Sequence, residues 1–193
     1  MPRPVRFDTS LLLDAAVSLA ATVGPLGVTM SAVAKETGAP SGSVYHRFPN
    51  RTALLAEVWL RTVERFQEGY RTALTTDNDP RRAGRAAARH IVAWCRAHPD
   101  EATLLLYGAG QFGRADWSEE HAARATEGNR RTLGTVTALA EALGATGPQA
   151  AERVTLALVD LPLSLVRRHF QAHEPLPPHA EDLAEECAAA LLG

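Results

Sequence analysis

The chain has 193 residues, a length that can bury a substantial core either in one domain or in a small head with a larger body. A hydrophobic content of 46% excludes an intrinsically disordered protein. The formal net charge of −2 disfavours a protein that coats DNA through charge alone, because such a protein needs a strongly basic surface.

Charge is unevenly distributed along the chain. Residues 1–51 hold five basic and three acidic side chains, a net charge of +2, so the remaining residues carry −4. This asymmetry has the sign expected for a chain that presents its N-terminal segment to nucleic acid.

Two features bear on the compartment. Cys95 and Cys187 are isolated, with no C-x-x-C motif and no secretory leader, which predicts free thiols in a reducing cytoplasm. The longest apolar run, residues 155–166, is shorter than the roughly 20 residues that span a bilayer. We therefore expect a soluble, cytoplasmic protein without a membrane segment.

The first predicted helix follows a short basic terminus. Arg3 and Arg6 are placed to lie in a DNA minor groove, as basic arms do in other DNA-binding folds, but an ordinary disordered terminus explains two arginines equally well. The helix is predicted to begin at Asp8 or Thr9 and to end at Gly24-Pro25. Its apolar row repeats at helical spacing through Leu12, Ala16, Leu19 and Val23.

Residues 29–51 contain two short helix patterns separated by a glycine and a proline. Thr29 occupies a capping position, because its hydroxyl can accept a hydrogen bond from a backbone N–H two or three residues on. Gly38 ends the first helix in the left-handed conformation, and Pro40 cannot continue it. The spacing predicts one buried face made by Met30, Val33, Ala34 and Thr37.

A second short helix opens at Pro40 or Ser41, with Val44 and Phe48 pointing inward. Arginine can grip guanine through two parallel hydrogen bonds, and hydroxyls bind phosphate oxygens. A helix, a tight turn and a second helix with this chemistry predict a helix-turn-helix that reads DNA. The side chains at its outward or edge positions are Ser41, Ser43, Tyr45, His46 and Arg47.

The block VTMSAVAKETGAPSGSVYHRFPNRTALL, residues 28–55, closely resembles the DNA-binding domain of the tetracycline-repressor (TetR) family of bacterial transcriptional regulators. The residues that carry the resemblance are Val33, Ala34, Gly38, Gly42, Tyr45, Phe48, Arg51 and Leu54. Pro40 and Ser41 depart from the family, in which a capping Ser or Thr and a Lys or Arg are common.

The resemblance implies that the second short helix is the recognition helix. It also implies that Arg51 begins the next helix, where relatives usually place a phosphate-binding lysine. The predicted DNA-binding residues are Arg6, Thr29, Ser41, Gly42, Ser43, Tyr45, His46, Arg47 and Arg51.

Beyond the head, a long helix is predicted from Arg51 or Thr52 to about Ala73, apolar on two sides and therefore packed on two sides. Residues 75–80 form turns and mark a boundary. Residues 108–114 are glycine-rich but lack the ending of a phosphate loop, so we interpret them as a flexible joint. The remaining helices are predicted over residues 81–98, 100–107, 118–143, 148–173 and 178–192.

The predicted fold is all-α with about nine helices. A helix-turn-helix head occupies residues 1–51, a linking helix residues 52–75, and a regulatory body for ligand binding and dimerisation residues 76–193. The helix at 148–173 is apolar on two sides, which requires a partner beyond its own core. In the resembled family the last two long helices pair between subunits, which implies a homodimer through residues 148–192.

Such a dimer would place two recognition helices in successive major grooves, about 34–36 Å apart or a multiple of it, on a near-palindromic operator. The expected function is a repressor that is released by a small apolar or amphipathic effector, with no other cofactor. The candidate lining residues of the effector pocket, each more often a plain core residue, are Trp94, His98, Leu105, Phe112, Trp117 and Asp160.

Asp160 stands out because it interrupts an apolar helix beside Pro162, where a kink is expected. If it is buried, its carboxylate needs either a ligand or an arginine of a neighbouring helix.

Two other function classes stay open. A helical metal-dependent enzyme could use His169 with His173, or Cys95 with His98, but no motif anchors a third ligand. A sequence-independent DNA-binding protein would need a more basic surface. We expect neither enzymatic activity nor a bound metal.

Overall fold

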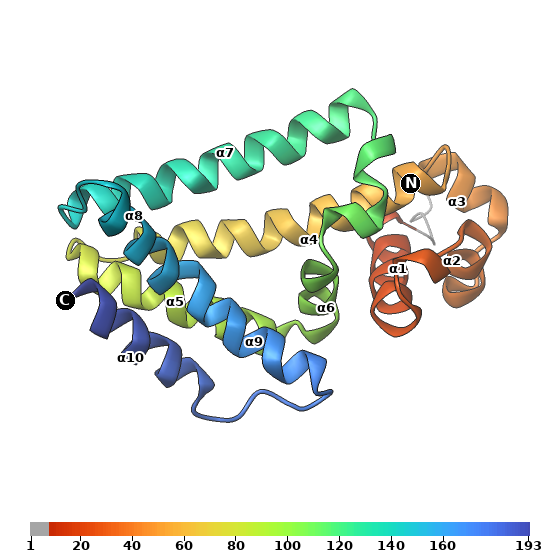
Figure 1. Cartoon of the computed structure of the whole chain (residues 1–193). Helices are drawn as coiled ribbons and strands as arrows, with labels where there is room; N and C mark the ends of the chain where they lie inside the picture. The colour runs from red at the N-terminus through yellow and green to blue at the C-terminus, as the bar shows by residue number, and fades with distance from the viewer. Residues whose placement is uncertain (1–7) are drawn as a thin grey trace, which may run out of the picture. The chain divides into compact units, whose positions relative to one another are not determined.

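The computed structural model describes residues 8–193, which form helices and connecting loops with no strand (Figure 1). The predicted DNA contact of Arg6 lies outside the described residues. By their contacts, the described residues divide into two compact units. Unit 1 holds the residues up to Val63 with Asp100–Thr126, and unit 2 holds Glu64–Pro99 with Glu127–Gly193. In residues 8–193 we find no helix with both the length and the apolar composition of a membrane span.

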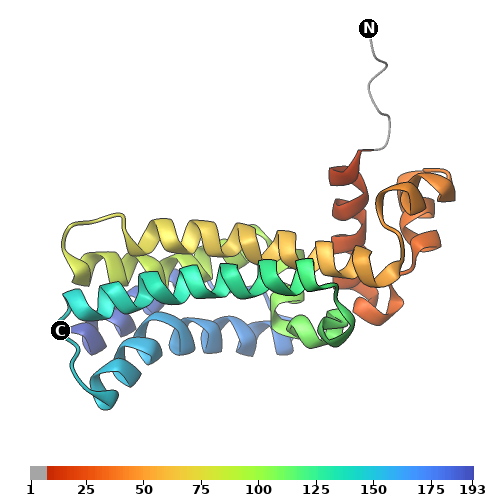
Figure 2. The same ribbon diagram turned by 90° about the horizontal axis from the view of Figure 1, so that it is seen from above.

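The helix α4 (Arg51–Leu74) is unbroken and contributes residues to both units; it is coloured orange to yellow in Figures 1 and 2. Its bounds agree with the predicted ones within a residue. Leu54, Val58 and Thr62 are fully buried, and Tyr70 is buried as well. The division into ranges 1–51, 52–75 and 76–193 stays a prediction about role, because compact units do not assign roles.

Unit 1 begins with α1 (Thr9–Val23), which is capped as predicted, because the Asp8 carboxylate accepts a hydrogen bond from a backbone N–H three residues on. Leu12 and Ala16 are fully buried, but Val23 is 57% exposed, contrary to the predicted row. The helix ends at Val23 because Gly24 turns the chain away with φ +77°.

The other elements of unit 1 follow in chain order. They are η1 (Pro25–Gly27), α2 (Met30–Thr37), α3 (Ser41–Arg47), the start of α4, α6 (Pro99–Tyr107), η2 (Ala109–Phe112), η3 (Arg114–Asp116) and the start of α7 (Glu119–Ala142). Their buried side chains join those of α1 in one hydrophobic core.

Residues 108–114, which we interpreted as a flexible joint, contribute a side chain to the core. They form short 3₁₀ turns around Phe112, which is fully buried in the core of unit 1. The ring of Phe112 lies 5.3 Å from that of Trp59, and its carbonyl oxygen accepts a hydrogen bond from the Trp117 indole at 2.9 Å. The glycines permit tight turns, and the aromatic side chains fix them.

Unit 2 is built on α5 (Pro80–Ala97), which begins one residue earlier than predicted. Asp79 caps it, and proline suits the first helical position because its missing N–H has no partner there anyway. The C-terminal helix α10 (Ala180–Leu192) packs along α5 (Figure 1). The buried alanines that permit this close packing are Ala83, Ala87 and Ala88 on α5 and Ala180, Ala184 and Ala188 on α10.

Ion pairs flank the packing of α10 against α5. Arg89 pairs with Glu181, Asp182 and Glu185, and Arg96 pairs with Glu181 at 2.8 Å. Arg89 and Arg96 of α5 are therefore both partnered by α10 within unit 2.

The segment after α7 is one helical run with a π-helical turn in its middle, drawn in blue in Figure 2. It consists of α8 (Pro148–Thr155), η4 (Leu156–Asp160) and α9 (Leu161–Gln171). Taken as one helix, it brings the number of α-helices in residues 8–193 to nine, which confirms the prediction.

Asp160 is exposed, so its carboxylate does not need the ligand or arginine that burial would have required. The buried row runs at four-residue spacing through Val154, Leu158, Pro162 and Val166. Asp160 is two residues from Leu158, about 200° around a helix, and so lies on the opposite, solvent-facing side.

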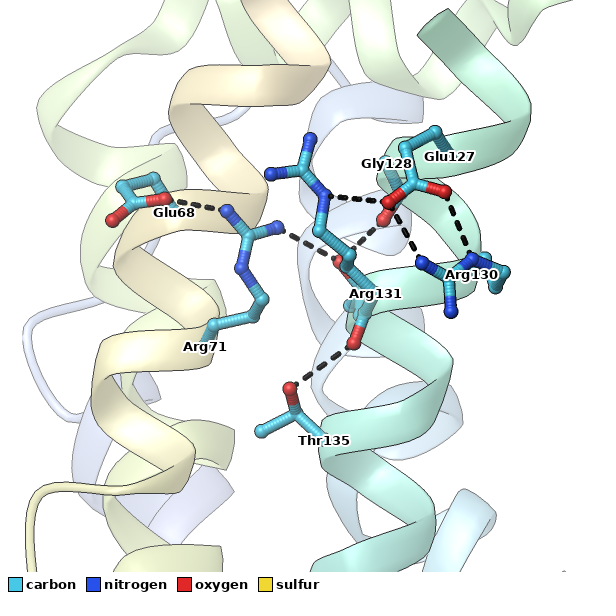
Figure 3. A network of polar contacts seen from close by, with 8 residues as sticks. Glu68, Arg71, Glu127, Gly128, Arg130, Arg131 and Thr135 are labelled. Carbon is cyan, nitrogen blue, oxygen red and sulfur yellow. Dashed lines mark hydrogen bonds and ion pairs between the residues drawn. The ribbon is translucent and has the colours of Figure 1, made fainter. Parts of the chain in front are cut away.

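Polar side chains join α4 to the second half of α7 in unit 2 (Figure 3). Arg71 pairs with Glu68 and donates to the Thr132 hydroxyl at 3.1 Å, and Thr132 donates to the Gly128 carbonyl. The Gln67 amide nearby is 6% exposed, and a Cβ added to Gly128 would lie 2.9 Å from its oxygen. Gly128 therefore makes room for a buried amide.

Candidate nucleic-acid interface

The first helix of the predicted helix-turn-helix, α2, has the predicted ends. The Thr29 hydroxyl accepts a hydrogen bond from the backbone N–H of Ala32 at 3.0 Å. Gly38 ends the helix with φ +64°, where only glycine avoids a Cβ penalty, and its N–H returns to the Ala34 carbonyl. Met30, Val33 and Ala34 are buried, as predicted.

The second helix, α3, has seven residues and is anchored from beneath. Val44 is fully buried and Phe48 nearly so, which confirms the two predicted anchors. Both belong to the hydrophobic core of unit 1. Because the anchors lie four residues apart on one face, the opposite face of α3 is left for solvent or a partner.

That outer face carries the chemistry predicted for DNA. Tyr45 is 54% exposed, and His46 and Arg47 are exposed beside it. Ser41 and Gly42 are exposed at the start of the helix, and Ser43 is half-buried. The Arg47 guanidinium lies 3.3 Å from the Thr9 hydroxyl at the start of α1. The structure thus gathers the predicted contacts of α3 on one side, and their contact with DNA stays a prediction.

Arg51 has partners that the sequence did not predict. Its Nε donates to the Val28 carbonyl at 2.6 Å, and its Nη2 donates to the carbonyls of Pro25 at 2.8 Å and Leu26 at 3.1 Å. These carbonyls belong to η1 and to the residue that follows it, so the first side chain of α4 grips the loop between α1 and α2.

Charged side chains of unit 1 support the head from α4 and α7. Arg61 of α4 pairs with Asp14 of α1 at 2.8 Å. Glu57 accepts hydrogen bonds from His121 at 3.1 Å and from Arg124 at 2.8 Å. Sequence reasoning missed these residues, although Glu57 and Arg61, four positions apart in the apolar first half of α4, were a signal.

A groove of about 760 Å³ lies beside these contacts, within unit 1. It is bordered by the starts of α1, α4 and α7, the end of α3 and the residues just before α7. Its lining includes Arg47, Asn50, Thr52, Glu57, Asp116 and His121.

The six predicted pocket residues are divided equally between the two units. Phe112 and Trp117 are core residues of unit 1, and Leu105 packs against that core. In unit 2, the Trp94 ring lies 5.3 Å from Phe66 in an edge contact and 4.9 Å from His98. None of the six lines the groove of unit 1 or the cavity of about 300 Å³ at one end of unit 2.

One buried group in unit 2 has no obvious function. The Nε2 atom of His90 is buried without a hydrogen-bond partner in the described structure. Burial lowers the pKa of His90, because it disfavours the charged ring. The ring lies against Gly69, where an added Cβ would be 2.6 Å from the His90 Cε1 atom.

Comparison with known proteins agrees with the helix-turn-helix. Residues 12–58 match the family model of bacterial regulatory proteins of the tetR family. This range contains α2, α3 and all predicted DNA contacts except Arg6. Comparison with curated proteins gives no match.

Solved structures are similar over nearly the whole chain. PfmR, a TetR family transcriptional regulator from Thermus thermophilus, has a TM-score of 0.73 at 17% identity, covering 96% of each chain. A transcriptional regulator from Rhodococcus sp. Rha1 has a TM-score of 0.67 at 25% identity, again covering 96% of each chain. FadR from Bacillus subtilis, solved in complex with stearoyl-CoA, has a TM-score of 0.69 at 14% identity, covering 96% of this chain and 98% of that one.

Proposed function

We propose that this chain, which belongs to the TetR family of bacterial transcriptional regulators, is a repressor. It binds a near-palindromic operator as a homodimer, and a small molecule releases it from the DNA. DNA binding and transcription regulation follow from the family. The dimer, the operator symmetry, repression and release are proposals. The observation that carries the proposal is the outer face of α3, where Tyr45, His46 and Arg47 are all exposed.

The chemistry of that face suits duplex DNA. An arginine forms two parallel hydrogen bonds with the O6 and N7 atoms of guanine, whereas a tyrosine hydroxyl binds phosphate oxygens. We assign base reading to Arg47 and Ser43, and phosphate contact to Tyr45. The anchors Val44 and Phe48 keep these side chains on a rigid helix, which direct base reading requires.

The proposed dimer rests on apolar side chains that unit 2 leaves partly uncovered. Leu156 is 38% exposed, and Val159 and Leu163 are half-buried on the same helical run. On α10, Leu183 and Cys187 are half-buried. Apolar side chains that are left partly uncovered on two helices suit the interface of a two-fold symmetric dimer.

The proposed effector site is in unit 2. Phe66, Tyr70, Trp94 and His98 form contacting ring pairs, and the unpartnered Nε2 of His90 lies beside Phe66. Aromatic rings with one unpartnered polar atom beside them suit an amphipathic ligand that carries a hydrogen-bond donor and that opens space between the rings on binding. The structure of B. subtilis FadR contains stearoyl-CoA, an amphipathic molecule, which supports this class of effector.

Selection of bound sequences from random DNA by the purified full chain tests the proposal. We expect an enriched near-palindrome whose half-sites are about 34–36 Å apart or a multiple of it. A Tyr45→Ala chain should enrich the same operator more weakly, because it loses a phosphate contact, and a Tyr107→Ala chain, which loses an exposed tyrosine of α6, should enrich it as the wild type does. Enrichment of an asymmetric half-site by a monomer would refute the dimer, and failure of the wild type to enrich any sequence would refute specific binding.

A reporter gene behind the selected operator tests repression. Co-expression of the chain should lower reporter output, and Tyr45→Ala should restore it. A rise in output with the wild-type chain would identify an activator instead.

A further inference from the structure

The Arg51 guanidinium binds backbone carbonyl groups of the chain itself. Three carbonyl oxygens, those of Pro25, Leu26 and Val28, accept its hydrogen bonds at 2.6 to 3.1 Å. Arginine has five N–H donors in a planar fork, so one side chain can hold several carbonyls at fixed angles. Hydrogen bonds from a charged donor are stronger than neutral ones, which makes this a firm attachment.

The carbonyl groups that Arg51 binds lie just before α2, whereas Arg51 itself begins α4. Val28 directly precedes Thr29, the cap of α2, and Arg51 directly follows Asn50, whose side chain accepts a hydrogen bond from the Ala53 N–H at the start of α4. Arg51 and Val28 are 23 positions apart, and the whole helix-turn-helix lies between them. Arg51 therefore ties together the two ends of the DNA-reading segment.

We infer that Arg51 is a positioning residue for DNA binding, which fixes the start of α2 against the start of α4 and does not act as a phosphate contact. The inference rests on the proposed DNA-reading role of α3. Its physical basis is that base reading needs α3 held to a fraction of an ångström, and a loop closed at its base has few alternative conformations.

A lysine at this position separates the two roles. Lysine keeps the charge and is the residue with which relatives usually bind phosphate at this position, but its compact ammonium cannot span three carbonyls as a planar fork does. A phosphate contact therefore tolerates Arg51→Lys. The attachment of Arg51 to the three carbonyls, which we call the clamp, does not.

The first measurement needs no DNA. In Arg51→Lys we expect the backbone N–H groups near residues 25–29 to exchange with solvent at least about tenfold faster than in the wild type. We also expect the melting temperature to fall by roughly 2–4 °C or more. Arg130→Lys is the matched control, because Arg130 is an exposed arginine of α7 paired with Glu127. Unchanged exchange and melting in Arg51→Lys would overturn the inference.

The second measurement uses the selected operator. We expect Arg51→Lys and Arg51→Ala to weaken binding by about tenfold or more, because each loses charged hydrogen bonds to the loop. The slope of log affinity against log salt should stay at its wild-type value for Arg51→Lys. Wild-type affinity in Arg51→Lys, together with a slope reduced by about 0.9 in Arg51→Ala, would show a phosphate contact instead.

The experiments distinguish failure of the proposed function from failure of the inference about Arg51. If the wild type selects no operator, the proposed function fails, while hydrogen exchange still tests the clamp. If the wild type binds the operator, and Arg51→Lys has the same operator affinity and the same rates of amide hydrogen exchange as the wild type, only the clamp is refuted. Unfolding of the head in Arg51→Lys would support the clamp, because an exposed phosphate contact contributes nothing to folding of the free protein.

Discussion

Tyr70 and Leu158 are joined by a buried hydrogen bond, in which the phenol donates to the backbone carbonyl at 3.0 Å. Leu158 is four residues before Pro162, whose ring nitrogen has no hydrogen to donate. In a regular helix that carbonyl would be paired with the N–H four residues on. Tyr70 of α4 supplies the donor that proline removes, at the π-helical turn that precedes α9.

The Tyr70 hydroxyl should therefore matter more than a typical hydroxyl. We expect Tyr70→Phe to lower the free energy of unfolding by about 1–3 kcal/mol, because it leaves a buried carbonyl without a donor. Pro162→Ala restores a backbone N–H that can take over. In the Pro162→Ala background, Tyr70→Phe should therefore be less destabilising, and denaturant unfolding of the four proteins measures the coupling. Additive effects would show that the two residues act independently.

Replacing Gly69 by alanine should have the opposite effect on stability from a typical Gly→Ala substitution in a helix. Gly→Ala in a helix interior normally stabilises by about 1 kcal/mol. At Gly69 the added Cβ would lie 2.6 Å from the His90 ring, so we expect Gly69→Ala to be destabilising instead. Gly134 is the matched control, because in α7 it has nothing within 4 Å of an added Cβ, and Gly134→Ala should be stabilising. Thermal unfolding distinguishes the two signs, and stabilisation by both would exclude close packing of His90 on Gly69.

His90 should make stability depend on pH. Its pKa is lowered from 6.5 in the folded chain by burial, so as pH falls through 6.5 the unfolded chain takes up a proton before the folded chain does. The free energy of unfolding should then decrease as pH falls from about 7.5 towards 5.5. His90→Gln removes this contribution, so its loss of stability over the same range should be smaller. Equal losses in the two proteins would show that His90 titrates alike in both states.

The helix-turn-helix was predictable because its signals are local. Thr29 and Gly38 end α2 through hydrogen bonds within a few residues, and Val44 and Phe48 reveal the buried face of α3 by their spacing alone. Each depends on backbone geometry that a short window of sequence determines.

The supporting contacts could not be predicted because they join distant parts of the chain. Nothing near Arg51 indicates that carbonyls 23 or more positions earlier will accept its hydrogen bonds.

Asp160 was misplaced for another reason. We judged it by its apolar neighbours in sequence, whereas its position around the helix puts it in solvent. Residues 108–114 were interpreted as a flexible joint because of their glycines, yet they place the ring of Phe112 in the core.

Base reading and phosphate contact on α3 can be separated by substitution. Arg47→Ala should cost about 1–3 kcal/mol on the preferred operator and less on operators changed at one guanine, because one bidentate contact is lost. Tyr45→Phe should weaken binding to all sequences by a similar factor, since it loses a contact that carries no sequence information. Selection from random DNA with each variant measures both effects, with Tyr107→Phe as the control for a lost exposed hydroxyl. A uniform loss in Arg47→Ala would assign Arg47 to the phosphates, and the 3.3 Å approach of its guanidinium to the Thr9 hydroxyl would then mark the side on which the DNA backbone passes.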